Sequence, residues 1–336
     1  MICSQNARMA KPFRILSIDG GGIRGLIPAL VLAEFERQTG RAIADCFDLI
    51  AGTSTGGILA LGLTRPGQNG RPRYSAQDLA DLYAKEGSRI FSTSPWRRLT
   101  NPMGLRAAKY SAEGIEGVLA QYFGETRLRD ALVEVLVTAY DLEQRDAFFY
   151  RRRRAREDAR YDVPMRVAAR ATSAAPTYFE PALVPWPIGR DVLVDGGVFA
   201  NNPAMCAYAE ARQTLLATSR PAEDLLLVSL GTGLYAEPFR YEEARGWGVA
   251  GWARPVLEVI FDGVADTVDY QLRQVLPPGR DGVPRYHRFQ TALDAGLSAM
   301  DDTTPTHIEG LYRAAEHILQ AQSAEVEALA RRLQGL

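Results

Sequence analysis

Short apolar runs recur along the chain, with helical patterns between them. The runs cover residues 14–19, 47–52, 133–140, 192–195 and 225–230, and the helical patterns include 26–39, 76–87, 111–123 and 203–217. Strands this apolar, without polar alternation, need cover on both faces. Strands that alternate with helices form a largely parallel sheet with helices packed on both of its sides. The sequence therefore predicts an α/β fold with a mostly parallel central sheet.

The last third of the chain has a different pattern. Residues 255–276 have helical spacing, 286–289 are typical of an edge strand, and 306–333 repeat apolar residues along one stripe. The opposite face of that stripe is mixed in charge, whereas a helix on a membrane surface would be rich in lysine or arginine there. We therefore expect one long amphipathic helix that packs back on the domain.

No internal repeat, linker or shift of composition divides the 336 residues. We expect a single domain over residues 13–320, with an N-terminal tail at 1–12 and the end of the C-terminal helix at 321–336. Residues 1–13 are polar and lack the apolar segment of a signal peptide. The longest uncharged stretch, 49–64, is shorter than the roughly 20 residues of a membrane span. These features predict a cytoplasmic protein.

The charge balance and the cysteines exclude several classes of protein. The chain has 39 lysines and arginines against 40 aspartates and glutamates. It therefore lacks the basic excess of a protein that binds a nucleic acid polymer. Cys3, Cys46 and Cys206 lie far apart, which argues against a disulfide framework and against a cysteine-rich zinc site.

A glycine-rich loop follows the first apolar run. Gly20, Gly21 and Gly22 come directly after the run, and Arg24 and Gly25 lead into the helical pattern. Such a loop points successive backbone N–H groups at one place and so binds an anion. Gly20, Gly22 and Gly25 also fit the G-x-G-x-x-G pattern of dinucleotide-binding loops. The loop by itself leaves two functions open, binding of a dinucleotide and binding of the oxyanion of a tetrahedral intermediate.

The second apolar run ends in a pentapeptide that favours the second function. Gly52-Thr53-Ser54-Thr55-Gly56 is a G-x-S-x-G motif between a strand and a helix. This is the arrangement of a nucleophile elbow, in which the serine lies on a strained turn with its hydroxyl exposed. A dinucleotide fold would instead end this strand in an acidic residue that binds the ribose. Ser54 is our candidate nucleophile, and Gly52 and Gly56 make room for the turn.

A serine nucleophile needs a base, and the best candidate is an aspartate. None of the three histidines lies in a glycine-rich loop after an apolar strand; they are His287, His307 and His317. Asp195 ends the fourth apolar run, directly before Gly196 and Gly197. We expect this run to be a buried parallel strand, which places Asp195 at the carboxyl edge of the sheet, where active sites assemble. The alternative is that Asp195 caps a turn, as an aspartate before glycine often does.

These three motifs, in this order, resemble the patatin-like phospholipases. The segments 171–181, 229–233 and 286–289 look similar to the family too, so the resemblance covers about residues 13–320. It implies a three-layer α/β fold, a Ser54–Asp195 dyad without histidine, and an oxyanion loop formed by residues 20–25. It also implies that neither a metal nor a cofactor takes part. The expected reaction releases fatty acids from membrane phospholipids through an acyl-Ser54 intermediate.

The subfamily and the partners are expectations of the same resemblance. Without a signal peptide the chain looks more like the bacterial cytoplasmic branch, which includes anti-phage effectors activated by cyclic oligonucleotides. That branch suggests a cyclic di- or trinucleotide as activator, attachment to the inner membrane when active, and a homo-oligomer as an assembly to test. Two alternatives stay open: a non-catalytic storage or nucleotide-sensing protein on the same scaffold, and a nicotinamide dehydrogenase.

Two further features have two interpretations each. The arginines at 151–154, with Arg156, are either a solvated face or a contact for anionic headgroups or a phosphorylated effector. Trp247 and Trp252 either pack within a loop or form an apolar lip at a membrane.

Overall fold

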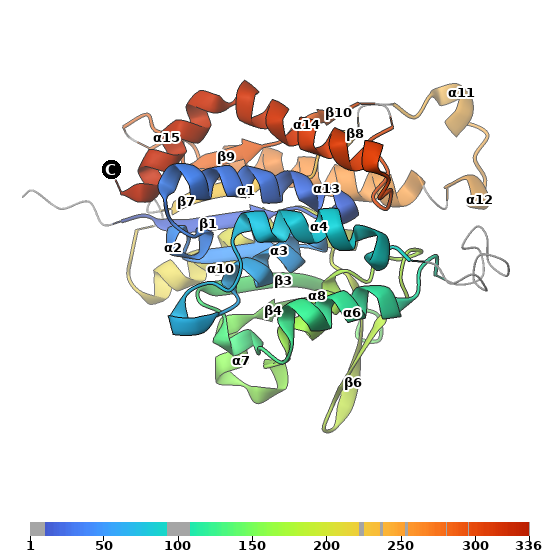
Figure 1. Ribbon diagram of the computed structural model, residues 1–336, viewed down its shortest axis with the longest axis horizontal. Helices are drawn as coiled ribbons and strands as arrows, with labels where there is room; N and C mark the ends of the chain where they lie inside the picture. Colours follow the sequence, from blue (N-terminus) through green and yellow to red (C-terminus); the bar gives the residue numbers. More distant parts are fainter. Residues whose placement is uncertain are drawn as a thin grey trace, which may run out of the picture.

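A mixed sheet runs through the centre of the molecule (Figure 1). The computed structural model describes residues 11–92, 108–221, 225–235, 238–252, 255–279, 281–294 and 296–335. Cys3 and all but two residues of the expected N-terminal tail lie outside these ranges. The strands of the sheet are β1 (Phe13–Ile18), β2 (Leu49–Gly52), β3 (Glu134–Asp141), β4 (Asp146–Arg151), β5 (Ala182–Trp186), β6 (Gly189–Asp195), β7 (Leu225–Leu230) and β9 (Tyr286–Phe289). A separate parallel pair joins β8 (Leu234–Tyr235) to β10 (Ala292–Leu293).

The larger part of the sheet is parallel, as the sequence predicts. The strand order is β5-β6-β3-β2-β1-β7-β9, and β4 also pairs with β3. The pairs β3–β2, β2–β1, β1–β7 and β7–β9 are all parallel. Every residue of β2 and β7 is buried, which confirms that both faces of these strands are covered. β9 is the edge strand expected at 286–289.

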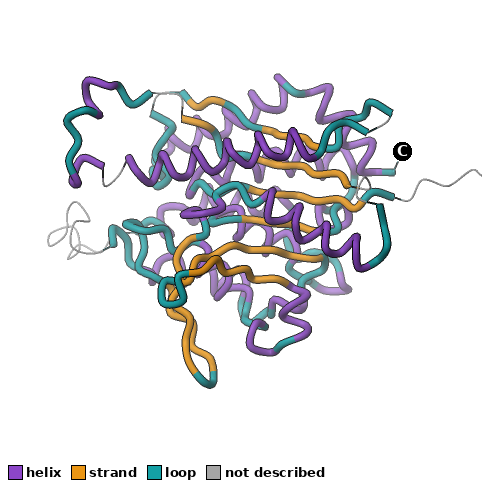
Figure 2. The backbone as a smooth tube through the Cα atoms, turned by 180° about the vertical axis from the view of Figure 1, so that it is seen from behind, coloured by secondary structure: helices purple, strands orange, loops and turns teal. Residues whose placement is uncertain are grey.

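Antiparallel pairing is confined to the other end of the sheet. β4 and β6 are antiparallel to β3, and β5 is antiparallel to β6. The expectation that Asp195 ends a parallel strand is therefore wrong. The apolar run at 192–195 is the buried end of a hairpin strand, and the first two residues of β6 are exposed where the hairpin projects from the body (Figures 1 and 2). A buried strand can be equally apolar whether it is parallel or antiparallel to its neighbour. The composition of the run therefore does not predict the direction of the strand.

Helices cover both faces of the sheet. One face carries α1 (Leu26–Thr39), α3 (Thr55–Thr64), α4 (Ala76–Ile90), α6 (Ala112–Phe123), α8 (Met165–Thr172), α14 (Pro305–Ala321) and α15 (Ser323–Gln334). The other face carries α10 (Ala204–Ala217) and α13 (Pro255–Val275). The short helices are α2 (Ile43–Cys46), α7 (Arg152–Glu157), α9 (Gly197–Ala200), α11 (Tyr241–Ala244) and α12 (Val249–Trp252). Neighbouring strand residues divide between the two cores: Leu16 packs in the core with α1, and Ile15 packs in the core with α10.

The C-terminal segment is two helices where the sequence predicts one. Gln322, with φ −114° and ψ 23°, separates α14 from α15. Its Nε2 lies 3.3 Å from the carbonyl oxygen of Arg288 in β9. The bend lets the apolar stripe of α15 follow the core, and the Arg14 guanidinium donates to the Leu333 carbonyl oxygen at 2.7 Å. The apolar spacing continues across the break, so the spacing alone did not reveal it.

Within the described ranges, none of the helices combines the length and the apolar character needed to cross a bilayer.

Candidate active site

The ends of β2 and β6 meet along one edge of β3. β4 occupies the opposite edge of β3 from Leu136 to Asp141, so β2 and β6 share the remaining edge. On that edge β2 ends with Gly52 opposite Val137. β6 arrives from the other direction and ends with Asp195 opposite Ala139. The turns after the two strands therefore open at the same place, although they are far apart in the sequence.

Ser54 lies on a strained turn between β2 and α3. Its φ of 55° and ψ of −123° are unusual for a residue with a side chain. Such strain is typical of functional turns, where the surrounding structure enforces it. A Cβ on Gly52 would lie 2.0 Å from the Gly56 carbonyl oxygen, and a Cβ on Gly56 would lie 2.1 Å from the Ile18 carbonyl oxygen. Both glycines are needed for the turn, which has the geometry of a nucleophile elbow.

Three buried threonines hold the elbow. The Ser54 N–H donates to Thr172 Oγ1 at 2.8 Å. The Thr53 hydroxyl lies 2.6 Å from the Ala200 carbonyl oxygen and 2.7 Å from Thr138 Oγ1. All three threonine side chains are excluded from solvent, so water does not compete for these hydrogen bonds. Their roles could not be predicted from the sequence, because a single threonine has no spacing pattern that indicates its partner.

The Asp195 carboxylate contacts the Ser54 side chain. Asp195 is only 2% exposed, and its partners are the Ser54 side chain and the Gly197 N–H, which donates to Oδ1 at 2.8 Å. Burial raises the pKa of Asp195 to about 7, and the two hydrogen bonds oppose that rise. Gly196 lets the chain pass close to β3, since a Cβ there would lie 2.1 Å from Thr138 Oγ1. A carboxylate with a pKa near neutrality suits the role of a general base.

Gly21 and Gly22 line the same cavity as Ser54 and Asp195. In the described part of the chain, neither of their N–H groups donates a hydrogen bond. Both groups are therefore available to an oxygen atom that enters the cavity. Of the expected oxyanion loop, these two glycines are the ones among the described residues that line the cavity with Ser54.

Gly20 and Gly25 have packing contacts instead. The Gly20 N–H donates to the Asn201 carbonyl oxygen at 3.0 Å. A Cβ on Gly25 would lie 2.0 Å from Thr55 Oγ1, so glycine at this position lets the loop and the elbow approach each other.

Arg24 is absent from the described residues that line the cavity. Its Nε donates to the Gly21 carbonyl oxygen over 3.4 Å. Burial lowers the pKa of Arg24, and the nearby carboxylates of Asp262 and Glu258 oppose this effect. Arg24 therefore lies between the glycine loop and the acidic side chains of α13.

Two distant segments anchor the glycine loop from outside. The Thr232 hydroxyl donates to the Gly20 carbonyl oxygen at 2.7 Å. The Ile23 N–H donates to the Met300 carbonyl oxygen at 2.8 Å. A Cβ on Gly22 would lie 2.1 Å from that same Met300 oxygen, and Gly22 has a φ of 59°. Contacts with segments from the last third of the protein thus stabilise the backbone conformation of the glycine loop.

A buried ion pair fixes the residue before the loop. The Arg288 guanidinium donates to Asp19 Oδ1 at 3.0 Å, to Asp19 Oδ2 at 2.6 Å and to Ser229 Oγ at 2.8 Å. The two side chains are 7% and 2% exposed. Burial raises the pKa of Asp19, and the charge of Arg288 opposes this rise. Because Asp19 directly follows β1, the pair sets where the glycine loop begins.

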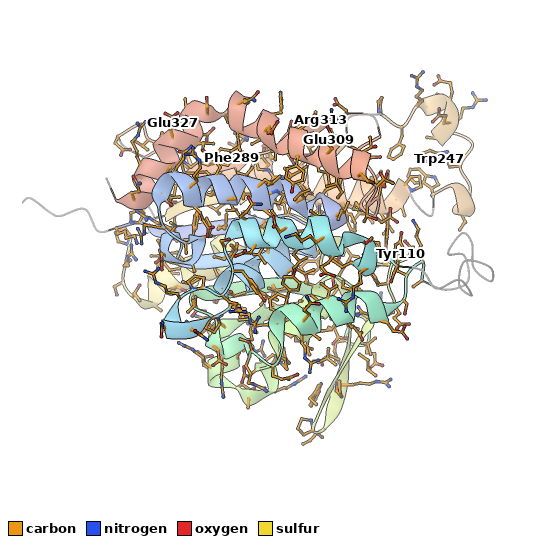
Figure 3. The ribbon with its side chains drawn as sticks, viewed as in Figure 1. Tyr110, Trp247, Phe289, Glu309, Arg313 and Glu327 are labelled. Carbon is orange, nitrogen blue, oxygen red and sulfur yellow. The ribbon has the colours of Figure 1, made fainter. Side chains whose placement is uncertain are left out.

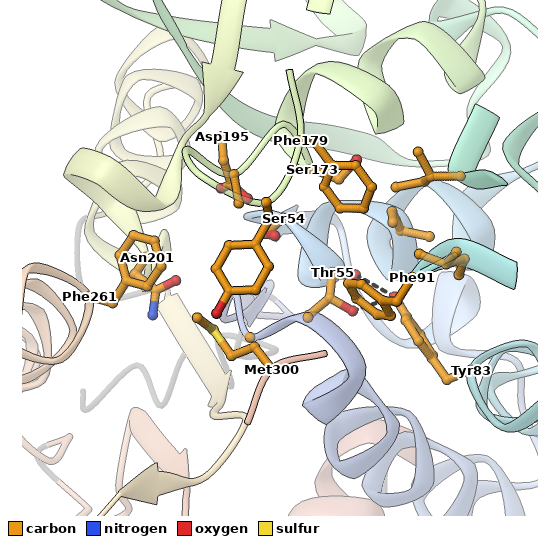
Figure 4. Close-up of a pocket in the computed structure, with 17 residues that line it drawn as sticks. Ser54, Thr55, Tyr83, Phe91, Ser173, Phe179, Asp195, Asn201, Phe261 and Met300 are labelled. Atoms are coloured by element: carbon orange, nitrogen blue, oxygen red, sulfur yellow. Dashed lines mark hydrogen bonds between the residues drawn. The ribbon is translucent and has the colours of Figure 1, made fainter. Parts of the chain in front are cut away.

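The cavity beside Ser54 is mainly apolar (Figure 4). Its apolar and aromatic lining residues are Ile58, Tyr83, Ile90, Phe91, Ile115, Ala175, Tyr178, Phe179, Phe261 and Met300. Figure 4 shows Phe261 and Asn201 on one side of Ser54, and Tyr83 and Phe91 on the other. Such a cavity suits an apolar chain whose reactive carbonyl lies at Ser54.

The three histidines and the arginine-rich segment at 151–156 do not line the cavity among the described residues. None of the three histidines is among the described residues that line the cavity, and His287 instead pairs with Glu325 at 2.6 Å. The arginines at 151–153 have carboxylate partners at 2.8 to 3.0 Å, namely Glu210 and Glu134. These pairs support the interpretation of the basic run as a structural, solvated face.

More than half of the chain matches a known protein family. Residues 16–208, more than half of the sequence, match the family described as patatin-like phospholipase. The chain belongs to the patatin-like phospholipase family. This confirms the resemblance drawn from the glycine loop, the elbow and the Asp195 motif.

Several patatins match along nearly the whole chain. Patatin group M-2 of Solanum tuberosum is 32% identical, with 94% of this chain and 85% of the relative covered. A protein of the same organism named probable inactive patatin-3-Kuras 1 is 32% identical, with coverage of 95% and 89%. Patatin-like protein 4 of Arabidopsis thaliana is 31% identical, with coverage of 91% and 82%. Among solved structures, human GIVD cytosolic phospholipase A2 matches with a TM-score of 0.44 and 12% identity, over 97% of this chain and 60% of that chain.

Proposed function

We propose that this protein is a serine lipid acyl hydrolase of the phospholipase A type, with Ser54 as nucleophile and Asp195 as base. The observation that carries the proposal is the contact between these two side chains on the wall of an apolar cavity. Membership of the patatin-like phospholipase family supports the substrate class.

In the first half of the reaction, ionised Asp195 accepts the proton of the Ser54 hydroxyl while Oγ attacks the ester carbonyl carbon. The carbonyl oxygen becomes an oxyanion, to which the N–H groups of Gly21 and Gly22 donate. Loss of one such donor typically costs about 100-fold or more in rate. The intermediate then collapses, the bond to the glycerol oxygen breaks, and Asp195 gives its proton to the departing lysophospholipid.

In the second half, a water molecule attacks the carbonyl carbon of the acyl-Ser54 ester, and Asp195 accepts the proton of this water. The second tetrahedral intermediate uses the same N–H donors. Its collapse breaks the bond to Ser54 Oγ, which regains a proton from Asp195, and the fatty acid leaves. The two steps require only groups that this chain supplies, together with water.

The test is fatty acid release from mixed phospholipids by the purified protein, beside Ser54→Ala and Asp195→Asn. We expect release by the unaltered protein and a loss of at least about 1,000-fold in each variant, because the two residues act as a unit. One relative is named as probably inactive, so the non-catalytic alternative has to be tested as well. No release, together with no labelling of Ser54 by a fluorophosphonate probe, would support a storage or sensing role.

Activation by a cyclic di- or trinucleotide, as in the bacterial anti-phage branch, stays a prediction. The same assay tests it when it is repeated with and without a panel of cyclic nucleotides. The arginines at 151–153 are poor candidates for the nucleotide site, because each of them already forms an ion pair with Glu210 or Glu134. Unchanged stimulation after their replacement would remove them as the site. Whether the chain forms a homo-oligomer is measured by sedimentation equilibrium.

A further inference from the structure

A flap of exposed apolar side chains lies beside the cavity. The flap consists of residues 238–252 and the first turn of α13, residues 255–259. Its exposed apolar side chains are Phe239, Tyr241, Val249, Trp252, Val256 and Val259. We propose that the flap docks on the surface of a zwitterionic phospholipid bilayer. This inference rests on the proposed lipid hydrolysis and adds the surface through which the enzyme meets its substrate.

The flap lies at the same end of the molecule as the active site. β1 and its parallel neighbours run toward the right-hand end in Figure 1, and α11 and α12 project from that end. Figure 3 shows Trp247 in this projecting part. Phe261, two residues beyond the flap in α13, lines the cavity. A Cβ on Gly197 would lie 3.1 Å from the Phe261 ring, so α13 connects the flap directly to the Asp195 turn.

The aromatic rings of the flap pack on one another. Phe239 and Trp247 are edge to face with their centroids 5.3 Å apart, and Trp247 and Trp252 are edge to face at 5.1 Å. Val249 is 93% exposed and Tyr241 is 72% exposed. An apolar patch of this kind marks an interaction surface. Tryptophan and tyrosine suit the boundary of a membrane, where one end of the ring is apolar and the other is wet.

The charge of the flap indicates which lipid surface it fits. The flap contains two arginines and three glutamates, so it carries no excess of positive charge. A surface that binds anionic lipid would carry an excess of lysine and arginine. The flap therefore fits a zwitterionic bilayer, held by apolar contact, and we expect its binding to depend little on salt concentration.

A second copy of this chain is the competing occupant. It would cover the same apolar side chains, but it would also sit beside the cavity and obstruct the approach of a lipid to Ser54. A bilayer covers the flap and delivers the substrate at the same place. The position of the flap thus favours the bilayer.

The first experiment measures binding to phosphatidylcholine vesicles by sedimentation. The full chain carries Ser54→Ala, so that the vesicles stay intact. Adding Val249→Asp and Trp252→Asp is expected to lower the partition constant by about tenfold or more, because each change removes an apolar side chain from the interface. The matched control is Leu216→Asp, on a side chain that is 67% exposed. It lies at the far end of α10, where Arg220 contacts Lys11 at 2.6 Å, and its substitution is expected to leave binding unchanged.

The second experiment separates docking from catalysis. With Ser54 present, Val249→Asp/Trp252→Asp is expected to keep kcat/KM for a short, water-soluble ester within about twofold while hydrolysis of vesicles falls about tenfold or more. If the double variant fails to fold, Tyr241→Ser takes its place. An unaltered protein that cleaves neither substrate yet binds vesicles through the flap would contradict the proposed function but support docking.

Two results would overturn the docking proposal. One is equal binding to vesicles by the flap variants and their parent. The other is a dimer that dissociates in the flap variants while binding to vesicles does not change, which would assign the flap to self-association.

Discussion

Asp195 is a carboxylate in surroundings that disfavour its charge. Burial raises its pKa to about 7, so below that pH most molecules hold Asp195 protonated and unable to accept the Ser54 proton. We predict that kcat/KM for a soluble ester falls about tenfold per pH unit below pH 7 and is level above it. A profile that stays flat down to about pH 5 would show that another group is the base.

The same pKa shift predicts an effect on stability. An unfolded aspartate has a pKa of about 3.9, so between that value and about 7 the folded protein binds the proton more tightly than the unfolded chain does. The contribution of Asp195 to stability is full at low pH and is lost as the pH rises through about 7. We predict that Asp195→Asn raises the free energy of unfolding in urea by about 2–4 kcal/mol at pH 8.

Two comparisons check that stability prediction. The gain from Asp195→Asn should disappear below about pH 3, where Asp195 is protonated in both the folded and the unfolded state. Ser54→Ala keeps the buried carboxylate, so it should be inactive without gaining stability at pH 8. An Asp195→Asn protein that is less stable than its parent at pH 8 would mean that the carboxylate contributes more through its hydrogen bonds than it costs through burial.

At the scale of residues, the sequence predicted the groups that occur in motifs. Ser54, Asp195 and the glycines of the loop could be found because their types and spacing are specific to the chemistry. Thr172 and Thr232, which hold the elbow and the loop, could not. Each of them acts through one hydrogen bond to a residue far away in the sequence, namely Ser54 or Gly20. No local sequence pattern predicts such a partner.

At the scale of elements, the ion pair between β9 and the end of β1 is the clearest target. Arg288→Met leaves Asp19 buried without its partner, and breaking a buried pair in this way typically costs about 3–5 kcal/mol. We predict a loss of that size in urea unfolding, together with a fall in kcat, since Asp19 sets the start of the glycine loop. The double variant Asp19→Asn/Arg288→Met should recover much of the stability. A single variant as stable as its parent would contradict this account.

Two glycines provide a matched pair of substitutions. A Cβ on Gly56 would lie 2.1 Å from the Ile18 carbonyl oxygen, whereas a Cβ on Gly263 in α13 meets no atom within 4 Å. We predict that Gly56→Ala destabilises the fold and disables the elbow. Gly263→Ala should instead raise stability by about 0.5–1 kcal/mol through better helix propensity. Thermal unfolding of both variants measures the difference, and a change of the same sign in both would refute the packing argument.

The elements themselves were largely predictable, but strand direction was not. The helices at 26–39, 111–123 and 203–217 appear within one residue of their expected bounds. Asp195 lies at the edge of the sheet beside the end of β2, as expected. It is carried there by an antiparallel hairpin strand and not by a parallel strand. The direction of β6 follows from its local hairpin with β5 and from its antiparallel pairing with β3, which is distant in the sequence.

At the scale of the whole molecule, α15 contributes to the core that spans the sheet. Val326, Leu329, Ala330 and Leu333 are at most 3% exposed. Burial of a large apolar side chain contributes about 1.5–3 kcal/mol, and the net stability of a domain is only about 5–15 kcal/mol. We predict that a chain without residues 323–336 fails to unfold cooperatively in thermal circular dichroism. Glu327→Ala, an exposed change on the same helix, should have little effect, and a cooperative transition in the shortened chain would contradict the prediction.

The three-layer arrangement could be derived from the sequence because it depends on which strands are apolar along their whole length. The break between α14 and α15 could not, since Gln322 interrupts the helix without a glycine or proline. Its conformation follows from contacts with β9 and with α15 itself. Such contacts exist only once the sheet has formed.

The anchoring of the glycine loop decides when activity can arise during synthesis. Ser54 is made early, but the Ile23 N–H finds its acceptor at Met300 and Asp19 finds its partner at Arg288. A chain still growing on the ribosome therefore carries Ser54, the proposed nucleophile, long before the glycine loop has its anchors. On the proposed function, the growing chain gains its hydrolytic activity only after Arg288 and Met300 have been made.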